Sequence, residues 1–293
     1  MLTAVLGLGQ IGLVAAIALG WAAKKFAVDV DERETKIRAI LPGANCGGCG
    51  FPSCSSYASA VSAGTAPINL CRSGGSAVVE NIAHIMRMKV ETSTAQIAVV
   101  LCQGDDRKAT LKYHYLGLHD CNAANQIAGG PKLCPSGCLG LGSCVAVCAF
   151  SAIAITAHGL AVVNRERCTG CGKCVAICPR HVIRLAPATA TIHVLCNSHD
   201  KGGVVRTYCK VGCIGCGLCR KAVPSAYVLD RFLAHIDYSH AALAVLAADA
   251  IAICPNQCIV DFTKNYPDDR LLHPLPAIPD RPALVTDDEK AQR

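Results

Sequence analysis

The sequence predicts an α+β protein in which an apolar N-terminal helix precedes several small units that are organised by cysteines. The chain has 293 residues, of which 21 are cysteines, while aromatic residues make up only 4%. Aromatic side chains supply much of the burial energy of large cores, so their scarcity argues against one large conventional core. A hydrophobic content of 52% with 17% charged residues excludes a disordered chain.

The formal net charge of +7 is a weak indication of nucleic-acid binding. The chain has no dense Lys/Arg run of the kind that follows phosphates. Thiolates bound to a metal would also add negative charge that this count leaves out. We therefore expect no nucleic-acid partner.

The first element is an apolar helix over residues 1–25, which we expect to be a permanent single-pass anchor. Residues 2–23 carry no charged side chain, and a helix of that length spans about 33 Å, enough for a hydrocarbon layer of roughly 30 Å. A cleaved secretory signal is the alternative, but its positive charge would precede the apolar run, whereas Lys24 and Lys25 follow it. The positive-inside rule then places everything downstream on the cytoplasmic side of the inner (plasma) membrane, where disulfides are disfavoured.

Residues 26–90 form the first predicted cysteine module, with the pattern C-x2-C-x4-C-x16-C. We expect a short helix over residues 31–41, with Asp31 as its N-cap, and another over residues 53–64. Four thiolates in one short segment suit a single iron–sulfur cluster, although this spacing alone does not exclude zinc. The predicted ligands are Cys46, Cys49, Cys54 and Cys71.

Residues 91–190 contain the motif that favours iron–sulfur over zinc. The run C-x2-C-x2-C-x3-C-P over residues 168–179 is typical of bacterial ferredoxins, in which the fourth cysteine ligates a neighbouring cluster. The required partner is the C-x3-C-x5-C-x3-C run over residues 134–148. Exchanging the fourth cysteines predicts two [4Fe–4S] clusters, one held by Cys134, Cys138, Cys144 and Cys178, the other by Cys148, Cys168, Cys171 and Cys174.

Residues 191–264 predict a ferredoxin-like unit that has lost one of two clusters. The same exchange gives one complete set of predicted ligands, Cys213, Cys216, Cys219 and Cys254. The positions expected to hold the other cluster are Val223, Ala244, Ala247 and Ala250. All four losses fall on one cluster, as expected if a whole cluster was lost and the other kept.

An internal repeat relates these two regions. Val100-Leu-Cys102 and Val194-Leu-Cys196 each predict a short strand that runs into a polar turn. The cysteines at 134, 138 and 144 recur at identical intervals at 209, 213 and 219, but Leu141 stands in the place of Cys216. We predict that Cys134 supplies the ligand that Leu141 cannot, with Cys121 and Cys102 as the alternatives.

Four clusters use sixteen of the cysteines and leave Cys102, Cys121, Cys196, Cys209 and Cys258. The simplest interpretation is that these are small buried apolar residues. The alternative is a further cluster drawn from Cys102, Cys121, Cys196 and Cys209. No dinucleotide motif, P-loop or catalytic arrangement is found, so no catalytic residue is predicted. Residues 265–293 read as a Pro-rich, poorly ordered tail.

With its parts in this order, the sequence resembles the B subunit of the Rnf electron transport complex, in its long polyferredoxin-type version. The resemblance covers nearly the whole chain and rests on the anchor and on three motifs. These are Asn45-Cys46-Gly-Gly-Cys49-Gly-Phe-Pro-Ser-Cys54, Gly130-Pro-Lys-Leu-Cys134-Pro-Ser-Gly-Cys138 and Cys209-Lys-Val-Gly-Cys213-Ile-Gly-Cys216. The sequence departs from the family pattern at Ala149 after Cys148, at Val223 and at the three alanines, which leaves the number of clusters open.

The resemblance implies an electron-transfer subunit of a membrane-bound ferredoxin:NAD oxidoreductase that moves Na+ or H+, a translocase with no complete active site on this chain. Reduced ferredoxin is the expected donor, and integral membrane, flavin-binding and NAD-binding subunits are the expected partners. Two other functions stay open. One is a polyferredoxin relay for another membrane oxidoreductase, and the other is a cluster-based redox sensor that controls a transcription factor.

Overall fold

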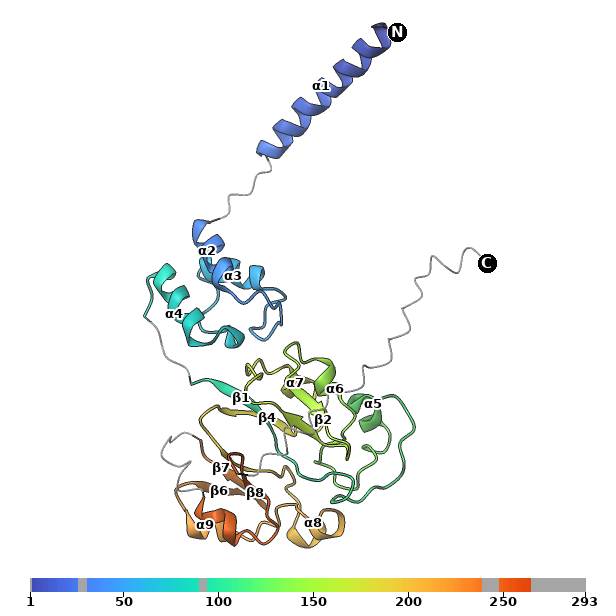
Figure 1. The fold of residues 1–293 in the computed structure, drawn as a ribbon, viewed down its shortest axis with the longest axis vertical. Helices are drawn as coiled ribbons and strands as arrows, with labels where there is room; N and C mark the ends of the chain where they lie inside the picture. The colour runs from blue at the N-terminus through green and yellow to red at the C-terminus, as the bar shows by residue number, and fades with distance from the viewer. Residues whose placement is uncertain (1, 26–30, 90–93, 239–247, 265–293) are drawn as a thin grey trace, which may run out of the picture.

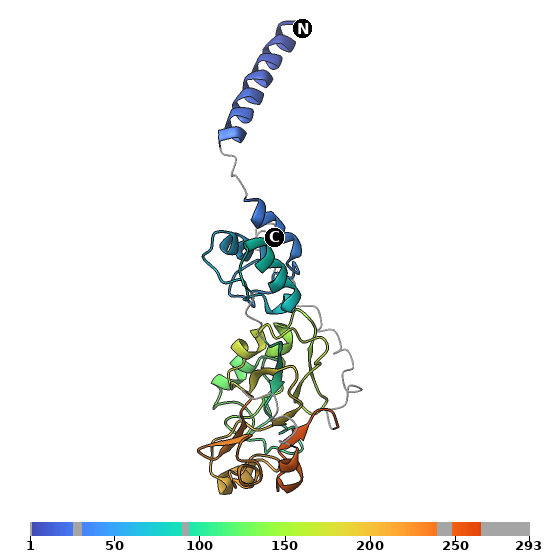
Figure 2. The same cartoon turned by 90° about the vertical axis from the view of Figure 1, so that its left-hand side faces the viewer.

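The structure is a computed structural model that describes residues 2–25, 31–89, 94–238 and 248–264. Figures 1 and 2 show a long N-terminal helix, a small group of helices, and a strand-containing region in which short helices flank pairs of strands. All 21 cysteines are described, and none of them forms a disulfide. The predicted tail over 265–293 lies outside the described residues.

The N-terminal helix α1 (Leu2–Lys25) has 24 residues and ends in Lys24 and Lys25. The predicted helix is therefore confirmed. Among the described residues, none of the helices combines the length and the apolar character that crossing a membrane requires. The side chains of residues 2–8, 11 and 23 lie outside the described part, and the anchor stays a prediction.

Four short elements form what we call the module (residues 32–86): α2 (Glu32–Ile40), α3 (Cys54–Ser62), the 3₁₀ helix η1 (Arg72–Gly74) and α4 (Gly75–Met86). The Asp31 carboxylate caps α2 by accepting a hydrogen bond from Arg33 N at 2.8 Å. The Ser53 hydroxyl caps α3 in the same way, from Ser56 N at 3.1 Å. Both helices predicted for this region are thereby confirmed. Their buried side chains, including Ile37, Tyr57 and Ile82, make one core.

The next elements make the first unit (residues 96–187). Strand β1 (Gln96–Val100) pairs antiparallel with the last strand, β4 (Ile183–Pro187). Between them in sequence lies an antiparallel hairpin of β2 (Ile153–Ile155) and β3 (Ala161–Val163). The helices α5 (Cys121–Gln126) and α6 (Ser143–Ala146) precede the hairpin, and α7 (Lys173–Ile177) follows it. First and last strands of the unit therefore lie side by side, with the cysteine-rich segments between them in sequence.

The second unit (residues 192–261) has the same topology. Strand β5 (Ile192–Val194) pairs with β8 (Ile259–Asp261) around the hairpin of β6 (Tyr227–Asp230) and β7 (Leu233–Ile236). Here α8 (Gly202–Tyr208) and α9 (Leu218–Ala222) precede the hairpin, and α11 (Asp249–Ile253) leads into β8. The strands predicted before Cys102 and Cys196 are confirmed as β1 and β5. The mixed α+β architecture predicted for both regions is also confirmed.

In the second unit, apolar side chains occupy two of the four positions that would hold the predicted lost cluster. Val223 is 6% exposed and Ala250 is fully buried, and both belong to the core that contains Tyr227 and Leu233. Ala244 and Ala247 lie outside the described residues. At the two described positions, Val223 and Ala250, the side chains are therefore part of the apolar core.

Paired glycines bend the loop before each short cysteine-bearing helix. Six glycines, spaced two apart, have φ between 65° and 82°, a region that favours glycine; they are Gly140, Gly142, Gly170, Gly172, Gly215 and Gly217. The second glycine of each pair is the N-cap of α6, α7 or α9. This recurrence makes the three loops structurally equivalent.

Replacing Gly170 by Ala should destabilise the first unit much more than replacing Gly172. Both have positive φ, a strain of about 1–2 kcal/mol for a side chain. A Cβ at Gly170 would also overlap the carbonyl oxygen of Gln96 on β1, whereas at Gly172 the nearest atom is Leu185 Cδ1 at 3.9 Å. The overlap should add about 1–3 kcal/mol. Anaerobic thermal unfolding of both variants measures the difference, and equal losses would contradict it.

Candidate iron–sulfur centres

Three small pockets are lined by predicted cysteine groups. The first, which we call the module site, is lined by Cys46, Cys49, Cys54 and Cys71. The second, the outer site, is lined by Cys148, Cys168, Cys171 and Cys174. The third, the C-terminal site, is lined by Cys213, Cys216, Cys219, Cys254 and also Cys258. The fold thus brings together three of the four predicted groups.

The spacing of the thiols fits a cluster better than a single metal ion. Zn–S bonds of about 2.3 Å place the sulfurs of a tetrahedral zinc site about 4 Å apart. Among the described residues, which include every cysteine, the only group that brings three ligand atoms within 4.8 Å of one another is His199, Asp230 and His235. Thiols that share a cavity at wider spacing suit an iron–sulfur cluster, which is larger than one ion.

The module site receives hydroxyl and backbone support from its own loops. The Ser73 hydroxyl lies 3.7 Å from Cys46 Sγ and 3.8 Å from Cys71 Sγ, within hydrogen-bonding range of sulfur. Burial raises the pKa of the Cys71 thiol, and the Ser73 contact opposes that rise. A hydroxyl between two thiols stabilises their ionised form, which is the form that binds metal.

The outer site is buried against the first strand. Cys168 Sγ accepts a hydrogen bond from Ala98 N of β1 at 3.3 Å, and Cys148 Sγ accepts one from Ala152 N at 3.3 Å. Burial, followed by the charges of the neighbouring cysteines, raises the pKa of the Cys174 thiol to about 12. A thiol with that pKa is protonated at neutral pH, so metal must displace its proton on binding.

The C-terminal site holds a fifth cysteine, and the repeat shows which one is surplus. Gln257, with φ of 49°, precedes Cys258, just as His181, with φ of 48°, precedes Val182 in the first unit. Cys258 is 3% exposed and Val182 is 2% exposed. Cys258 therefore occupies an apolar core position, although its Sγ lies 3.5 Å from Cys254 Sγ. A hydrogen bond from Cys258 lowers the pKa of Cys254 to about 6.

The fourth predicted group is only partly assembled. Cys144 is raised in pKa mainly by burial and then by the nearby thiols of Cys138, Cys121, Cys174 and Cys178. Cys134 packs in a different core, with Val205, Tyr208 and Cys209. The structure thus places Cys138, Cys144 and Cys178 near one another. The fourth thiol near them is that of Cys121, the alternative to Cys134 that the sequence analysis left open. We call the group of Cys121, Cys138, Cys144 and Cys178 the inner site.

Cys121 reaches the inner site because α5 docks on α6 and α7. Asp120 caps α5 through Ala123 N at 2.8 Å and accepts a hydrogen bond from the Ser143 hydroxyl at 2.8 Å. The Cys121 N–H donates to the same hydroxyl at 2.6 Å. The sequence signal for this placement is the N-cap aspartate directly before Cys121, which marks the start of a short helix.

The module site and the outer site share a wall. Cys171, a predicted ligand of the outer site, also lines the module cavity. A Cβ built on Gly48 would lie 2.9 Å from both the Cβ and the carbonyl oxygen of Cys171. Arg72 Nη1 donates to Gln96 Oε1 on β1 beside this contact. The module therefore meets the first unit backbone to backbone, with two cysteine sites adjoining.

Three family models match the regions that contain these sites. Residues 41–73 match an Fe-S cluster family, residues 161–184 match a 4Fe-4S binding domain, and residues 210–261 match the 4Fe-4S single cluster domain of ferredoxin I. The matches support [4Fe–4S] clusters as the cofactors and ferredoxin-like units as the fold. The single-cluster description agrees with the loss of one cluster from the second unit.

Curated relatives match over most of the chain. The B subunit of the ion-translocating oxidoreductase complex of Methanosarcina acetivorans is 38% identical, covering 86% of this chain and 95% of its own length. The B subunit of the proton-translocating ferredoxin:NAD(+) oxidoreductase complex of Clostridium ljungdahlii is 42% identical, covering 85% of this chain and 88% of its own. The Na(+)-translocating counterpart of Acetobacterium woodii is 41% identical, over 88% of this chain and 78% of its own.

Cys216→Ala should remove one cluster, whereas Cys258→Ala should remove none. Cys216 is exposed and belongs to the ferredoxin run, while Cys258 holds the position of an apolar core residue. Iron and acid-labile sulfide per chain should fall by about four each in the first variant and stay unchanged in the second. A loss of iron in Cys258→Ala alone would show that Cys258 replaces Cys216 as a ligand.

Proposed function

Because this chain belongs to the family of B subunits of ion-translocating oxidoreductase complexes, we propose that it is the electron-transfer subunit of a membrane-bound ferredoxin:NAD oxidoreductase. In this role it relays single electrons from reduced ferredoxin to membrane subunits of the complex, which couple the flow to translocation of Na+ or H+. It belongs to the translocase class as a subunit and carries no complete active site. The observation that carries the proposal is the series of adjoining cysteine sites in a chain of this family.

We propose that the thiols of the module, outer, inner and C-terminal sites each ligate one [4Fe–4S] cluster. When bound, such a cluster supplies one-electron exchange, with a potential set by ligation, burial and hydrogen bonds to sulfur. The proposed ligands keep fifteen of the sixteen predicted cysteines and replace Cys134 by Cys121. The geometry around Cys144 supports the exchange.

The sites follow one another in space. The module site and the outer site share Cys171 as a wall residue. The outer and inner sites adjoin as well, because the Cys174 and Cys178 thiols both act on Cys144. We propose that electrons enter at the two units and leave through the module, which follows α1 directly in the chain.

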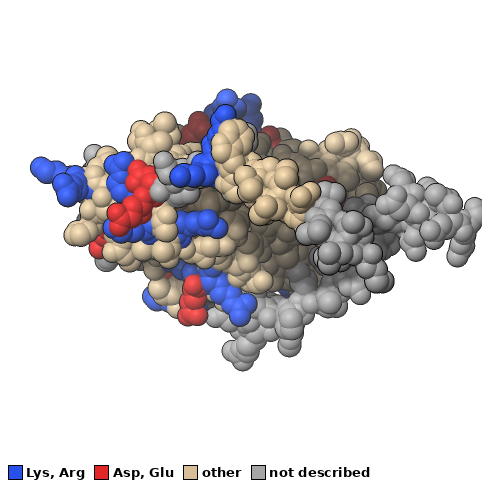
Figure 3. Space-filling view, turned by 90° about the horizontal axis from the view of Figure 1, so that it is seen from above, with Lys and Arg blue, Asp and Glu red and all other residues tan. Residues whose placement is uncertain are grey.

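The remaining features are proposed as follows. Residues 1–25 anchor the chain in the inner (plasma) membrane, and the cysteine domains (26–90, 91–190 and 191–264) and the tail (265–293) lie on the cytoplasmic side. The expected partners are integral membrane, flavin-binding and NAD-binding subunits. On the face seen from above, Lys and Arg are more prominent than Asp and Glu (Figure 3), in keeping with the net charge of +7.

The two other functions differ from this one in their partners. A relay for another membrane oxidoreductase would share the cluster chain but would co-purify with different membrane subunits. A redox sensor could work with one exposed cluster and would need no series of sites. Purification of the complex under anaerobic conditions, followed by identification of its membrane subunits, separates the three.

Cys49→Ala should block electron delivery to the membrane partner while ferredoxin still reduces the other clusters. Cys49 lines the module site, which is the proposed exit. Reduction of the chain by ferredoxin, followed by absorbance, and ferredoxin-dependent NAD reduction by the whole complex measure the two steps separately. Asn69→Ala, an exposed change in the same module, is the control and should leave both steps unaltered. Unimpaired delivery in Cys49→Ala would refute the proposed order.

A further inference from the structure

Four cysteines that no proposed site uses lie together between the two units. A Cβ built on Gly104 would lie 3.6 Å from the Sγ atoms of both Cys102 and Cys209. One built on Gly137 would lie 3.3 Å from Cys134 Sγ and 3.8 Å from Cys102 Sγ. Three thiols from separate segments therefore face one another across bare glycine backbone.

Cys196 completes the group from the second unit. After burial and backbone hydrogen bonds, the charges that act most on its thiol are those of Cys213 and Cys102. Cys102 likewise acts on Cys134 and on Cys209. Cys102 is thus the common neighbour of the other three. We call this group of Cys102, Cys134, Cys196 and Cys209 the junction site.

Cys102 Sγ accepts a hydrogen bond from Gly104 N, two residues further along the chain, at 3.3 Å. The backbone amides at the same offset, Ser136, Ser198 and Val211, act to lower the pKa of the Cys134, Cys196 and Cys209 thiols. Gly140, Gly215 and Asn256 act in the same direction on Cys138, Cys213 and Cys254 of the inner and C-terminal sites. Such bonds stabilise sulfur in its charged, metal-binding form. A small apolar core residue has no need of them.

The junction site also has an internal two-fold relation. Cys102 Sγ accepts a second hydrogen bond from Cys138 N at 3.4 Å. The backbone amide of Cys213 acts at the corresponding position to lower the pKa of the Cys196 thiol. Cys138 and Cys213 are equivalent in the repeat, as are Cys134 and Cys209. Each unit therefore contributes two thiols at corresponding positions, and the two pairs meet at the interface.

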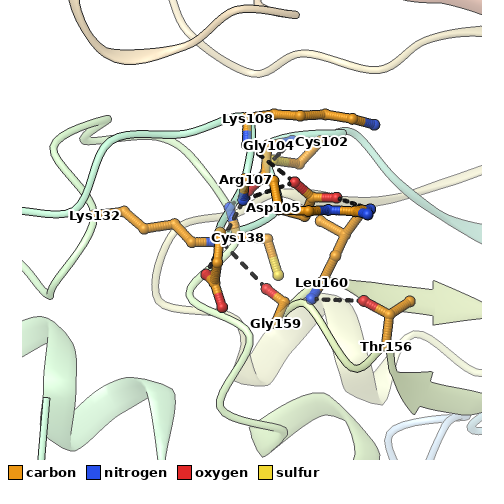
Figure 4. Close-up of polar contacts among 11 residues, drawn as sticks. Cys102, Gly104, Asp105, Arg107, Lys108, Lys132, Cys138, Thr156, Gly159 and Leu160 are labelled. Carbon is orange, nitrogen blue, oxygen red and sulfur yellow. Dashed lines mark hydrogen bonds and ion pairs between the residues drawn. The ribbon is translucent and has the colours of Figure 1, made fainter. Parts of the chain in front are cut away.

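Two buried cations adjoin the junction site. Lys132 is 1% exposed, and its Nζ donates to Gly104 O at 2.8 Å and to Gly159 O at 3.1 Å, with the Asp106 carboxylate at 3.5 Å (Figure 4). Arg180 is 9% exposed and donates to Cys134 O at 2.8 Å, to Asn125 Oδ1 at 2.8 Å and to Gly129 O. Among the described side chains, no carboxylate forms an ion pair with Arg180.

A buried cation without an anion is costly. The thiols of Cys134, Cys178, Cys102 and Cys138 act on Arg180 in the direction that favours its charge, and Lys132 acts on Cys209 and Cys138 in the same sense. A thiolate-bound cluster at the junction would supply the missing negative charge. Lys132 has the Asp106 carboxylate at 3.5 Å, so it is Arg180 that points to an anionic ligand beyond the carboxylates of the described residues.

We propose that Cys102, Cys134, Cys196 and Cys209 ligate a fifth [4Fe–4S] cluster at the junction of the two units. Cys138 N of the inner site donates to Cys102 Sγ, and Cys213 of the C-terminal site acts on the Cys196 thiol, so this site lies between those two. A cluster held by these four thiols would exchange single electrons with the inner and C-terminal sites. This relay role rests on the proposed function, whereas the existence of the site does not.

Lys132→Met should lower the midpoint potential of one cluster, since a buried positive charge stabilises the reduced, more negative state. Redox titration followed by EPR measures the shift. Lys210→Met, an exposed change next to Cys209, is the control and should leave every potential unaltered. If the midpoint potentials were unchanged in both variants, the claim that Lys132 acts on a cluster at the junction site would be wrong.

The decisive experiment counts iron and acid-labile sulfide in the anaerobically purified full-length chain. Five clusters give about twenty irons per chain, and Cys196→Ala should bring this to about sixteen. Cys102→Ala, on the other unit, should cause the same loss with the same missing EPR signal, and Cys258→Ala should cause none. Matching losses from two units exclude a local folding defect as the cause.

Three outcomes would overturn the proposal: about sixteen irons in the parent chain, twenty irons that neither variant reduces, or zinc without sulfide lost from the variants. The count needs no partner subunit, so it is independent of the proposed function. Five clusters in a chain that delivers no electrons to the membrane complex would refute the function and leave the junction site standing.

Discussion

The rest of the structure depends on one interaction, the hydrogen bond from a backbone N–H to a cysteine sulfur. With aromatic residues at only 4%, the chain has little side-chain burial with which to hold its loops in place. The loops instead turn at positive-φ glycines, and backbone N–H groups donate to sulfur at Cys102, Cys148 and Cys168. Glycine freedom costs conformational entropy on folding. A shared ligand that fixed the sulfurs would offset part of that cost, so that cofactor and fold would stabilise each other.

The sequence could predict whatever depends on neighbours along the chain. The N-cap residues Asp31 and Ser53, the strand before Cys102, and the spacing of the ferredoxin run are local features, and the fold bears out the helices and strands that they imply. Placing Cys121 required knowing that α5 docks on α6 and α7, which no spacing rule contains. Choosing between Cys121 and Cys134 likewise required the contact between units, because Cys134 faces Cys209 rather than the other members of its own run.

The two units show how far this architecture tolerates the loss of a cofactor. Both keep the same strand pairing, an outer pair around a hairpin. In the second unit, Val223 and Ala250 are buried in the core with Tyr227 and Leu233. Apolar side chains therefore fill these two positions of the second unit, which keeps the strand pairing of the first.

The sharing of the junction thiols between units has a consequence for biosynthesis. Cys102 and Cys209 are more than a hundred residues apart in the chain, so a nascent polypeptide presents the first pair long before the second pair leaves the ribosome. The module site can be filled early, but the junction can be completed only after both units have folded and met. Maturation of the chain therefore has a built-in final step, at which an unfinished or misfolded second half leaves the protein without a continuous path.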